Sequence, residues 1–233
     1  MKGHMVFFLH AIMIPMNAAV RPKLYIIVLA AGFSLRLGRP KALARVQSTT
    51  LLRRTLTLVA RCSPAKIAVV LPPRAVRHKI EARGLKVLFA VNSGRAAGLS
   101  SSVRSGIALA RWSSALLILP VDLAALNTRD LARLIARWRS GRRRVIARRI
   151  GRQDGASGGG IPLILPRWLY ARALAVTGDK GLRELVSGLP AQHRALLDLP
   201  SAALDVDTPS DLCTARQRLR RTIAARDYSV RAT

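Results

Sequence analysis

The sequence of 233 residues has few cysteines, histidines, aromatic residues and acidic residues. Its two cysteines, Cys62 and Cys213, are too few for a disulfide framework and do not show a metal-type spacing. The four histidines are dispersed, so neither a zinc site nor a Ser–His–Asp order can be argued. Two isolated thiols are typical of a reducing compartment, and we expect a cytoplasmic protein.

Apolar runs of membrane-spanning length are also absent. The stretch that comes nearest, Val6–Met16, is interrupted by His10 and Pro15 and is too short to cross a bilayer. Together with Lys2 before it and Asn17–Val20 after it, this stretch forms a weak secretory-signal pattern. We interpret residues 1–22 instead as an N-terminal extension, and we expect no membrane partner.

Acidic residues number 11, against 40 lysines and arginines, so the formal net charge is +29. Such a field favours anionic partners such as nucleotides, phosphorylated cofactors or nucleic acid. The alternative is a general enrichment of arginine on solvated faces, because the arginines are scattered as well as clustered. Aromatic residues make up 4%, which leaves few platforms for stacked bases, so nucleic acid is the least favoured of these partners.

Half of the residues are hydrophobic, which is enough for one domain with a sizeable core. Short apolar runs predict strands, and stretches of helical spacing lie between them. The predicted strands are residues 23–30, 66–71, 85–91 and 115–122, and the predicted helices are residues 51–62, 75–84, 101–112 and 128–138. This alternation predicts a Rossmann-like three-layer α/β sandwich, with a mostly parallel sheet covered by helices on both faces. Thr128 is the expected N-cap of the fourth helix.

After about residue 140 the pattern is weaker. Strands are expected within residues 142–150 and 161–165, and helices within residues 179–189 and 208–219. No repeat or low-complexity linker divides the chain. We therefore expect a single domain over residues 23–215, followed by a basic C-terminal tail at residues 216–233.

A loop rich in glycine and cations, LAAGFSLRLGRPK, spans Leu29–Lys41 after the first predicted strand. In open parallel sheets ligands bind beyond the carboxyl ends of the strands, which is where this loop begins. Gly32 and Gly38 permit positive φ and a close backbone approach to a ligand, and free N–H groups in such a turn bind phosphate oxygens. Arg36 and Lys41 add positive charge. The loop predicts a polyphosphate site, although it matches neither the Walker pattern nor G-x-G-x-x-G.

The same loop resembles the opening signature of nucleotidyltransferases, L-A-A-G-x-S-x-R-x-G-x-x-K. Its Ala-Ala-Gly-x-Ser form is similar to that of the molybdenum cofactor cytidylyltransferases, a branch of the MobA-like NTP transferase family. Four further blocks resemble that family in the same order along the chain: Val91–Ile107, Leu116–Asp122, Thr177–Val186 and Leu204–Leu212. The resemblance covers residues 24–213 and implies the sheet of the nucleotide-diphospho-sugar transferases.

The resemblance also implies roles for individual residues. Its nucleotide-binding positions are Leu29, Ala30, Ala31, Gly32, Ser34, Gly38, Asn92, Ser101 and Ser102. Lys41 and Arg36 would act on the phosphates. Asp122 would be catalytic and would hold Mg²⁺ together with Asp207, with Asp205 as the alternative second acid.

Structural interpretations remain open beside these roles. Asp207 could cap the helix that begins at Thr208-Pro209, and Asp122 could be an ordinary acid at a strand end. Ser101 and Ser102 could simply begin a helix. Asp179 and Arg183 could form a structural pair at a helix start rather than contact substrate.

The implied reaction is transfer of CMP from CTP to the phosphate of molybdopterin, with release of pyrophosphate and delivery to a molybdenum hydroxylase client. A phosphate oxygen is already an anion at neutral pH, so positioning and charge neutralisation suffice and no histidine triad is needed. The alternatives are a nucleotide-binding accessory protein for molybdenum hydroxylase maturation and another NTP or sugar-nucleotide transferase.

The sequence departs from the family pattern at three places. Relatives usually have Asp-x-Pro where this chain has Asp122-Leu123-Ala124, and many have Gly-His-Pro where it has Gly160-Ile161-Pro162. A glycine expected before the first long helix is replaced by Ser48. The replacement of histidine by Ile161 affects the acceptor site more than the nucleotide site.

Overall fold

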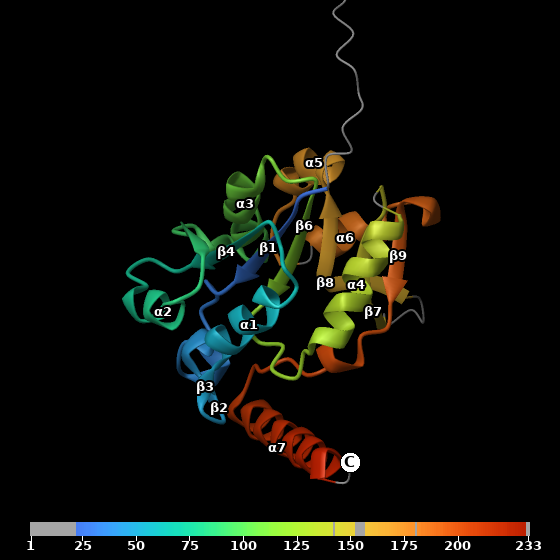
Figure 1. Cartoon of the computed structure of the whole chain (residues 1–233). Coiled ribbons are helices and arrows are strands. Elements are labelled where there is room, and N and C mark those ends of the chain that lie inside the picture. The colour runs from blue at the N-terminus through green and yellow to red at the C-terminus, as the bar shows by residue number, and fades with distance from the viewer. Residues whose placement is uncertain (1–21, 142, 152–156, 180, 232–233) are drawn as a thin grey trace, which may run out of the picture.

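The computed structural model describes residues 22–141, 143–151, 157–179 and 181–231 (Figure 1). Of the predicted N-terminal extension, all but Pro22 lies outside the described residues. Seven strands form the main sheet: β1 (Leu24–Leu29), β4 (Lys66–Leu71), β5 (Val87–Val91), β6 (Ala115–Pro120), β7 (Val145–Gly151), β8 (Ser157–Pro166) and β9 (Arg194–Leu197). Their order across the sheet is β5-β4-β1-β6-β8-β7-β9. β8 runs antiparallel to β6 and β7, and the other neighbouring pairs are parallel.

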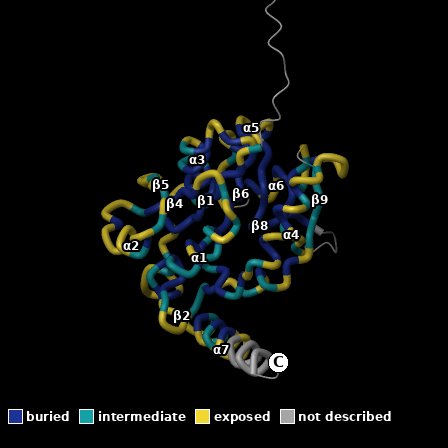
Figure 2. Tube along the Cα trace, viewed as in Figure 1, coloured by how far each residue is buried: buried dark blue, intermediate teal, exposed yellow. Residues whose placement is uncertain are grey.

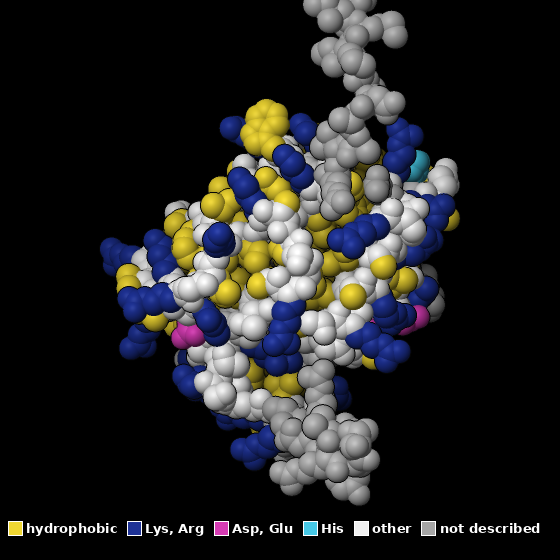
Figure 3. Space-filling model, viewed as in Figure 1, with side chains coloured by type: hydrophobic (Ala, Val, Ile, Leu, Met, Phe, Trp, Pro, Cys, Tyr) yellow, Lys and Arg dark blue, Asp and Glu magenta, His cyan; other side chains and the backbone are white. Residues whose placement is uncertain are grey.

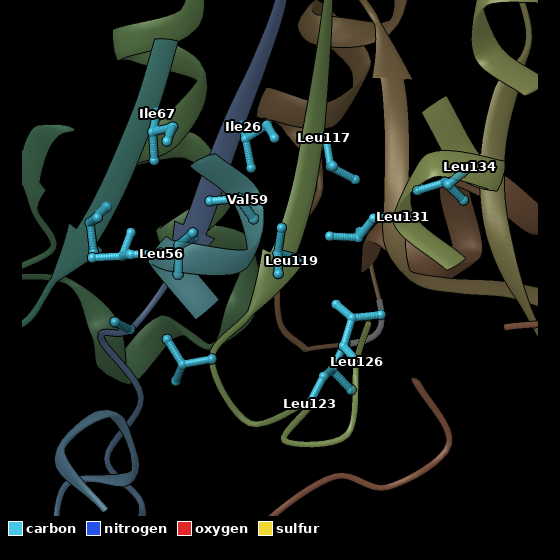
Figure 4. Close-up of a cluster of buried hydrophobic side chains, with 14 of the residues drawn as sticks. Ile26, Leu56, Val59, Ile67, Leu117, Leu119, Leu123, Leu126, Leu131 and Leu134 are labelled. Atoms are coloured by element: carbon cyan, nitrogen blue, oxygen red, sulfur yellow. The ribbon is translucent and has the colours of Figure 1, made fainter. Parts of the chain in front are cut away.

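Helices cover both faces of this sheet, which confirms the predicted fold class. They are α1 (Leu51–Ala60), α2 (Val76–Glu81), α3 (Leu99–Ala110), α4 (Thr128–Ser140), α5 (Tyr170–Ala175), α6 (Gly181–Ser187) and α7 (Pro209–Arg231). α1 and α4 pack on one face, where Figure 4 shows leucines of the two helices directed at β1 and β6. α3, α5 and α6 pack on the other face. Within the described residues, no helix is long and apolar enough to cross a bilayer.

β1 is the centre of the core, and it is buried on both faces (Figure 2). Ile26 belongs to the cluster under α1 and α4, and Ile27 belongs to the cluster under α3, because successive side chains of a strand point to opposite faces. Both isoleucines are fully buried. Burying such a side chain contributes about 1.5–3 kcal/mol, which is why a continuous apolar run was the strongest strand signal in the sequence.

The close packing of α3 on β1 predicts a stability loss in Gly106→Ala. A Cβ at Gly106 would lie 2.3 Å from Cδ1 and 2.9 Å from Cγ2 of Ile27. Overpacking of this kind costs about 1–3 kcal/mol, and since Ile27 is fully buried we expect this cost to exceed the gain of up to about 1 kcal/mol in helix propensity. Urea unfolding at fixed pH measures the difference.

Gly151→Ala is the matched control, because a Cβ there meets nothing within 4 Å. We expect it to change the free energy of unfolding by less than about 0.5 kcal/mol. If Gly106→Ala were as stable as the control, the contact with Ile27 would not limit the packing of α3.

Several local predictions differ from the structure. The N-cap of α4 is Asn127 and not Thr128: the Asn127 side chain accepts a 2.9 Å hydrogen bond from the Asp130 amide, and its backbone is still extended. α7 runs to Arg231 and so crosses the predicted start of the basic tail at residue 216. The hairpin of β2 (Arg45–Val46) and β3 (Thr49–Thr50) was not predicted, because two-residue strands carry no periodic signal.

Candidate active site

The carboxyl ends of β1 and β6 lie side by side, because the two strands pair in parallel from Leu24 to Leu29. The loop after β1 and the acid after β6 therefore share the lower edge of the sheet as drawn in Figure 1. A cavity of about 500 Å³ opens between them, and we call it the nucleotide cavity. Among the residues that line it are Leu29, Ala30, Ala31, Gly32, Ser34, Arg36, Lys41, Ser102, Asp122 and Asp207.

The loop closes on itself at two residues with positive φ. Gly38 has φ +68°, and Ser34 has φ +58°. Gly32 does not adopt a positive φ; Ser34 makes that turn instead, and its hydroxyl accepts a 2.9 Å hydrogen bond from the Lys41 amide. Gly38 therefore shapes the loop, but it does not line the cavity.

Lys41 joins the two aspartates that the sequence placed far apart. Its Nζ donates to Asp122 Oδ2 at 2.9 Å and also to Asp207 Oδ1, and Asp207 accepts a further hydrogen bond from Arg36. Burial alone would lower the pKa of Lys41, but the two carboxylates outweigh it and raise the pKa above its usual value. Lys41 is therefore an ammonium held between two carboxylates at neutral pH.

Backbone contacts explain why these aspartates converge. The Asp122 carbonyl accepts a 3.0 Å hydrogen bond from the Val206 amide, which fixes the segment before α7 against the end of β6. Val206 is fully buried in a cluster with Leu212 of α7. Because Val206 points inward, the aspartates on either side of it, Asp205 and Asp207, are left at the cavity edge.

The alternative role of Asp207 as a helix cap does not match the structure. Asp211 accepts hydrogen bonds from the amides of Asp207 and Thr208, and the Thr208 hydroxyl accepts one from the Asp211 amide. This is a capping-box arrangement, in which Thr208 and Asp211 satisfy the first turn of α7. The carboxylate of Asp207 remains directed at Lys41 and Arg36.

Asn92 and Ser101 are not among the residues that line the nucleotide cavity. Asn92 is buried, and its side-chain amide donates to the hydroxyls of Ser101 and Ser102 at 2.8 and 2.9 Å. Ser102 alone of these three lines the cavity. The structure thus gives Asn92 a supporting position, in which it fixes the first turn of α3 from behind.

Asp179 also supports α3. Its Oδ1 accepts a 2.7 Å hydrogen bond from the amide of Leu99, the first residue of the helix. Gly98, just before it, has φ +80°, and a Cβ there would lie 2.6 Å from Asp179 Oδ1. The structural interpretation of Asp179 is therefore supported by a hydrogen bond, while its position in the lining of the cavity keeps the substrate interpretation open.

Two substitutions separate these interpretations of Asp179. We expect Asp179→Ala to lose about 0.5–2 kcal/mol of stability, as when a helix loses the oxygen that caps it. We expect Asp179→Asn to retain most of that stability, since its amide oxygen can still accept from Leu99. Thermal unfolding gives the stability and initial rates give the activity. If Asp179→Asn were fully stable but inactive, the charge would act on substrate.

A second cavity, of about 290 Å³, adjoins the first, and we call it the acceptor-side cavity. Asp122, Asp179 and Asp207 line both cavities, and Asp205 lines the second. Four of the eleven acidic residues of a chain with net charge +29 are thus gathered at one place. Burial, and then the neighbouring Asp122 carboxylate, raise the pKa of Asp205. Such crowding of like charges requires cations close by.

The donor set is suited to a hard divalent cation. Asp122 and Asp207 supply oxygen ligands, and their shared contact with Lys41 Nζ shows that both reach a position where a cation sits. Among the described residues, no group of three or more His, Cys, Asp or Glu side chains is arranged to hold a metal. Two carboxylates are nevertheless a common protein contribution to a Mg²⁺ site, whose other ligands are water and substrate phosphate.

Sequence reasoning did not identify two arginines that line these cavities. Arg95 lies over the ring of Phe33 at 4.1 Å from the ring centroid, and both residues line the nucleotide cavity. Arg148 lines the acceptor-side cavity, in a run of arginines for which the sequence had indicated no place in the active site. Figure 3 shows why charge alone could not identify them, since basic side chains are spread over the visible face. For Arg148, the strand alternation of β7 is the signal that could have done so.

The family described as MobA-like NTP transferase domain matches residues 26–195. The chain is similar to Rv0371c from Mycobacterium tuberculosis H37Rv, with 26% identity and a TM-score of 0.66 over 84% of this chain and 98% of that chain. A structure of Rv0371c in complex with manganese gives 25% identity and a TM-score of 0.63, over 84% and 98% of the chains.

A nucleotidyl transferase from Methanothermobacter thermautotroptrophicus shares the fold, with 20% identity and a TM-score of 0.71 over 86% of this chain and 99% of that chain. No curated protein sequence matches the chain significantly. The family match, which covers most of the domain, supports nucleotidyl transfer as the general reaction.

Proposed function

The chain belongs to the MobA-like NTP transferase domain family, and from this premise we propose that it transfers CMP from CTP to the terminal phosphate of molybdopterin. In this reaction an acceptor phosphate oxygen attacks the α-phosphorus of CTP. The bond between the α-phosphorus and the bridging oxygen breaks, and pyrophosphate leaves. The product is a cytosine dinucleotide form of the cofactor, and a molybdenum hydroxylase is the proposed client.

One observation carries the proposal: Lys41 lies between Asp122 and Asp207 at the mouth of the glycine loop. The loop amides, Arg36 and Lys41 offer positive charge to a triphosphate, and the two carboxylates offer oxygen ligands to a divalent cation. An ordinary surface turn or an ordinary strand-end acid has no reason to bring these groups together. The combination is suited to a metal–triphosphate complex.

The residues of the chain would contribute mainly by position and charge. Lys41 would move from the carboxylates to the phosphates of the bound nucleotide, and Arg36 would bind a phosphate oxygen with its planar fork. Asp122 and Asp207 would hold Mg²⁺, which supplies charge neutralisation at the α-phosphate. The manganese complex of Rv0371c supports a divalent cation in the family. No side chain has to remove a proton, since the attacking oxygen is already ionised.

The preference for CTP is proposed from Ala31. This residue lines the nucleotide cavity and is buried, where guanylyltransferases of the family more often carry glycine. Its methyl group occupies space beside the nucleotide, which favours the smaller pyrimidine base over guanine. We therefore propose that kcat/KM is higher with CTP than with GTP.

The test is to incubate the purified full chain with each NTP, Mg²⁺ and molybdopterin, and to identify the nucleotide product by mass. A CMP adduct with pyrophosphate release supports the proposal. CTP binding without pyrophosphate release would indicate the accessory protein instead. Turnover with a sugar phosphate but not with molybdopterin would indicate a sugar-nucleotide transferase.

A further inference from the structure

The acceptor-side cavity has a composition that the nucleotide cavity does not share. Its charged lining consists of four aspartates and, among the described residues, two arginines, Arg148 and Arg183. Its remaining walls are apolar or glycine: Leu99, Pro120, Leu123, Ile150, Gly159, Gly160, Ile161, Leu163 and Leu182. No serine, threonine, asparagine or glutamine side chain is among the described residues of this lining. The cavity therefore offers charge and apolar surface, but no neutral hydrogen-bonding side chain.

Arg148 is positioned in this cavity by the sheet. Its side chain is only 16% exposed, and its guanidinium lies 3.6 Å from Asp205 Oδ1, a distance that describes an ion pair rather than a hydrogen bond. Its partner on β8 is Gly160, reached through a register shift between Ala147 and Arg148. A Cβ on Gly160 would lie 3.1 Å from Cδ1 and Cγ2 of Ile150, so the side chain of Ile150 covers this glycine and forms an apolar wall of the cavity. Arg149, the next residue, points to the opposite face and pairs with Asp198.

The charges that line the acceptor-side cavity favour Arg148 as the side chain that binds an anion. A phosphate monoester that approaches Asp122 from this side meets the carboxylates of Asp179, Asp205 and Asp207 as well. Lys41 already pairs with Asp122 and Asp207, so Asp179 and Asp205 are the carboxylates whose repulsion of the phosphate needs a further fixed cation. Arg183 is exposed, so solvent screens its charge, whereas Arg148 is largely shielded and carries the fork geometry that matches phosphate.

We propose that Arg148 binds the phosphate of the acceptor, and that this cavity selects a phosphate monoester with an apolar or planar body over a sugar phosphate. The inference rests on the proposed nucleotidyl transfer and narrows its acceptor. Sugar hydroxyls removed from water need hydrogen-bond partners. The aspartates can accept from hydroxyls on one side of the cavity, but hydroxyls buried against the leucine and isoleucine walls find no partner there, which is unfavourable. A ring with apolar faces meets no such cost, and its phosphate lies beside Arg148, close to Asp122.

The first test measures equilibrium binding of phenyl phosphate and of glucose 1-phosphate to the full chain by ³¹P NMR titration, without CTP. We expect phenyl phosphate to bind at least about tenfold more tightly than glucose 1-phosphate. Arg148→Gln should weaken phenyl phosphate binding about tenfold, and Arg148→Lys should weaken it less. Arg149→Gln is the matched control and should leave binding unchanged. Equal binding of the two esters, or unchanged binding in Arg148→Gln, would overturn the proposal.

Asp205→Asn distinguishes a ligand-binding Arg148 from one that only holds Asp205. If Arg148 were merely the partner of Asp205, the two substitutions would weaken binding equally. If Arg148 binds phosphate, removal of the Asp205 charge should leave phenyl phosphate binding equal or tighter. Thermal unfolding shows whether each variant folds. If Arg148→Gln does not fold, the binding of phenyl phosphate to Arg148→Lys is compared with that of the wild type instead.

The result of this binding experiment does not depend on whether the proposed reaction is correct. Phenyl phosphate binding requires neither CTP nor turnover, so it tests Arg148 even if molybdopterin is not the acceptor. In a turnover assay with an acceptor that the protein uses, Arg148→Gln should raise the KM for that acceptor about tenfold and leave the KM for CTP unchanged. Equal changes in both KM values would contradict a role confined to the acceptor.

Discussion

Asp122→Asn is expected to lower kcat by about 100-fold or more while the Kd for CTP changes by less than about threefold. Asp122 lies two residues after the buried strand β6, so its carboxylate is held at the sheet edge beside a rigid element and the asparagine variant should fold. The substitution keeps the shape but removes the negative charge that would hold the divalent cation at the reacting phosphate. Loss of one fixed electrostatic group of this kind typically costs 10²–10³ in kcat.

Initial rates at saturating CTP give kcat, and calorimetry gives the Kd. Asp198→Asn is the control, because Asp198 is exposed and pairs with Arg149 away from both cavities. Activity within about threefold of wild type would exclude Asp122 from the catalytic site. Asp207→Asn should show the same loss in milder form if Asp205, which lines the same acceptor-side cavity, can take its place.

Lys41→Ala is expected to weaken CTP binding by about 10–100-fold, which corresponds to about 1.5–3 kcal/mol for a charge-assisted hydrogen bond. The ammonium now shared by Asp122 and Asp207 is the cation nearest to both carboxylates. Without it the two acids repel each other and the triphosphate, and Arg36, which pairs with Asp207, compensates them only in part. Lys86→Ala, at an exposed lysine, should bind CTP as the wild type does.

The pH dependence gives a second readout for Lys41. Because its pKa is raised above 10.5 in the folded chain, the stabilisation from its ion pairs is fully present below that value and is lost only as the pH rises through the folded pKa. The Kd of the wild type for CTP should therefore be constant between about pH 7 and 9. A steep rise in Kd over this range, absent from Lys41→Ala, would mean that Lys41 titrates there.

The parts of the fold that depend on local pattern could be predicted from the sequence. The predicted strand at residues 66–71 coincides with β4, and the predicted start of α4 is correct although its cap lies one residue earlier, at Asn127. A continuous apolar run indicates a strand buried on both faces, and apolar residues at helical spacing indicate a helix buried on one face. Both patterns can be read from residues that are neighbours in the sequence. The shortest elements escaped prediction: β2 packs against α7 through Val46, and β3 pairs with β2.

For the site, local sequence pattern was enough to predict the residue types: a loop that turns at Gly38, cations at Arg36 and Lys41, and an acid after an apolar strand. Which of these residues meet depends on the tertiary structure. Lys41 lies 81 residues from Asp122 and 166 from Asp207, and their convergence depends on the parallel pairing of β1 with β6 and on the buried Val206.

The positions of several other residues likewise depend on the tertiary structure. Asn92 supports α3 because its buried amide is satisfied by two serine hydroxyls, and Asp179 supports the same helix from a distant segment. Arg148 and Arg149 are neighbours with the same side chain, but they lie on opposite faces of the strand. Arg148 lines a cavity, whereas Arg149 pairs with Asp198. Sequence determines which chemistry is available, whereas strand register and burial, which join residues far apart in the chain, determine where that chemistry acts.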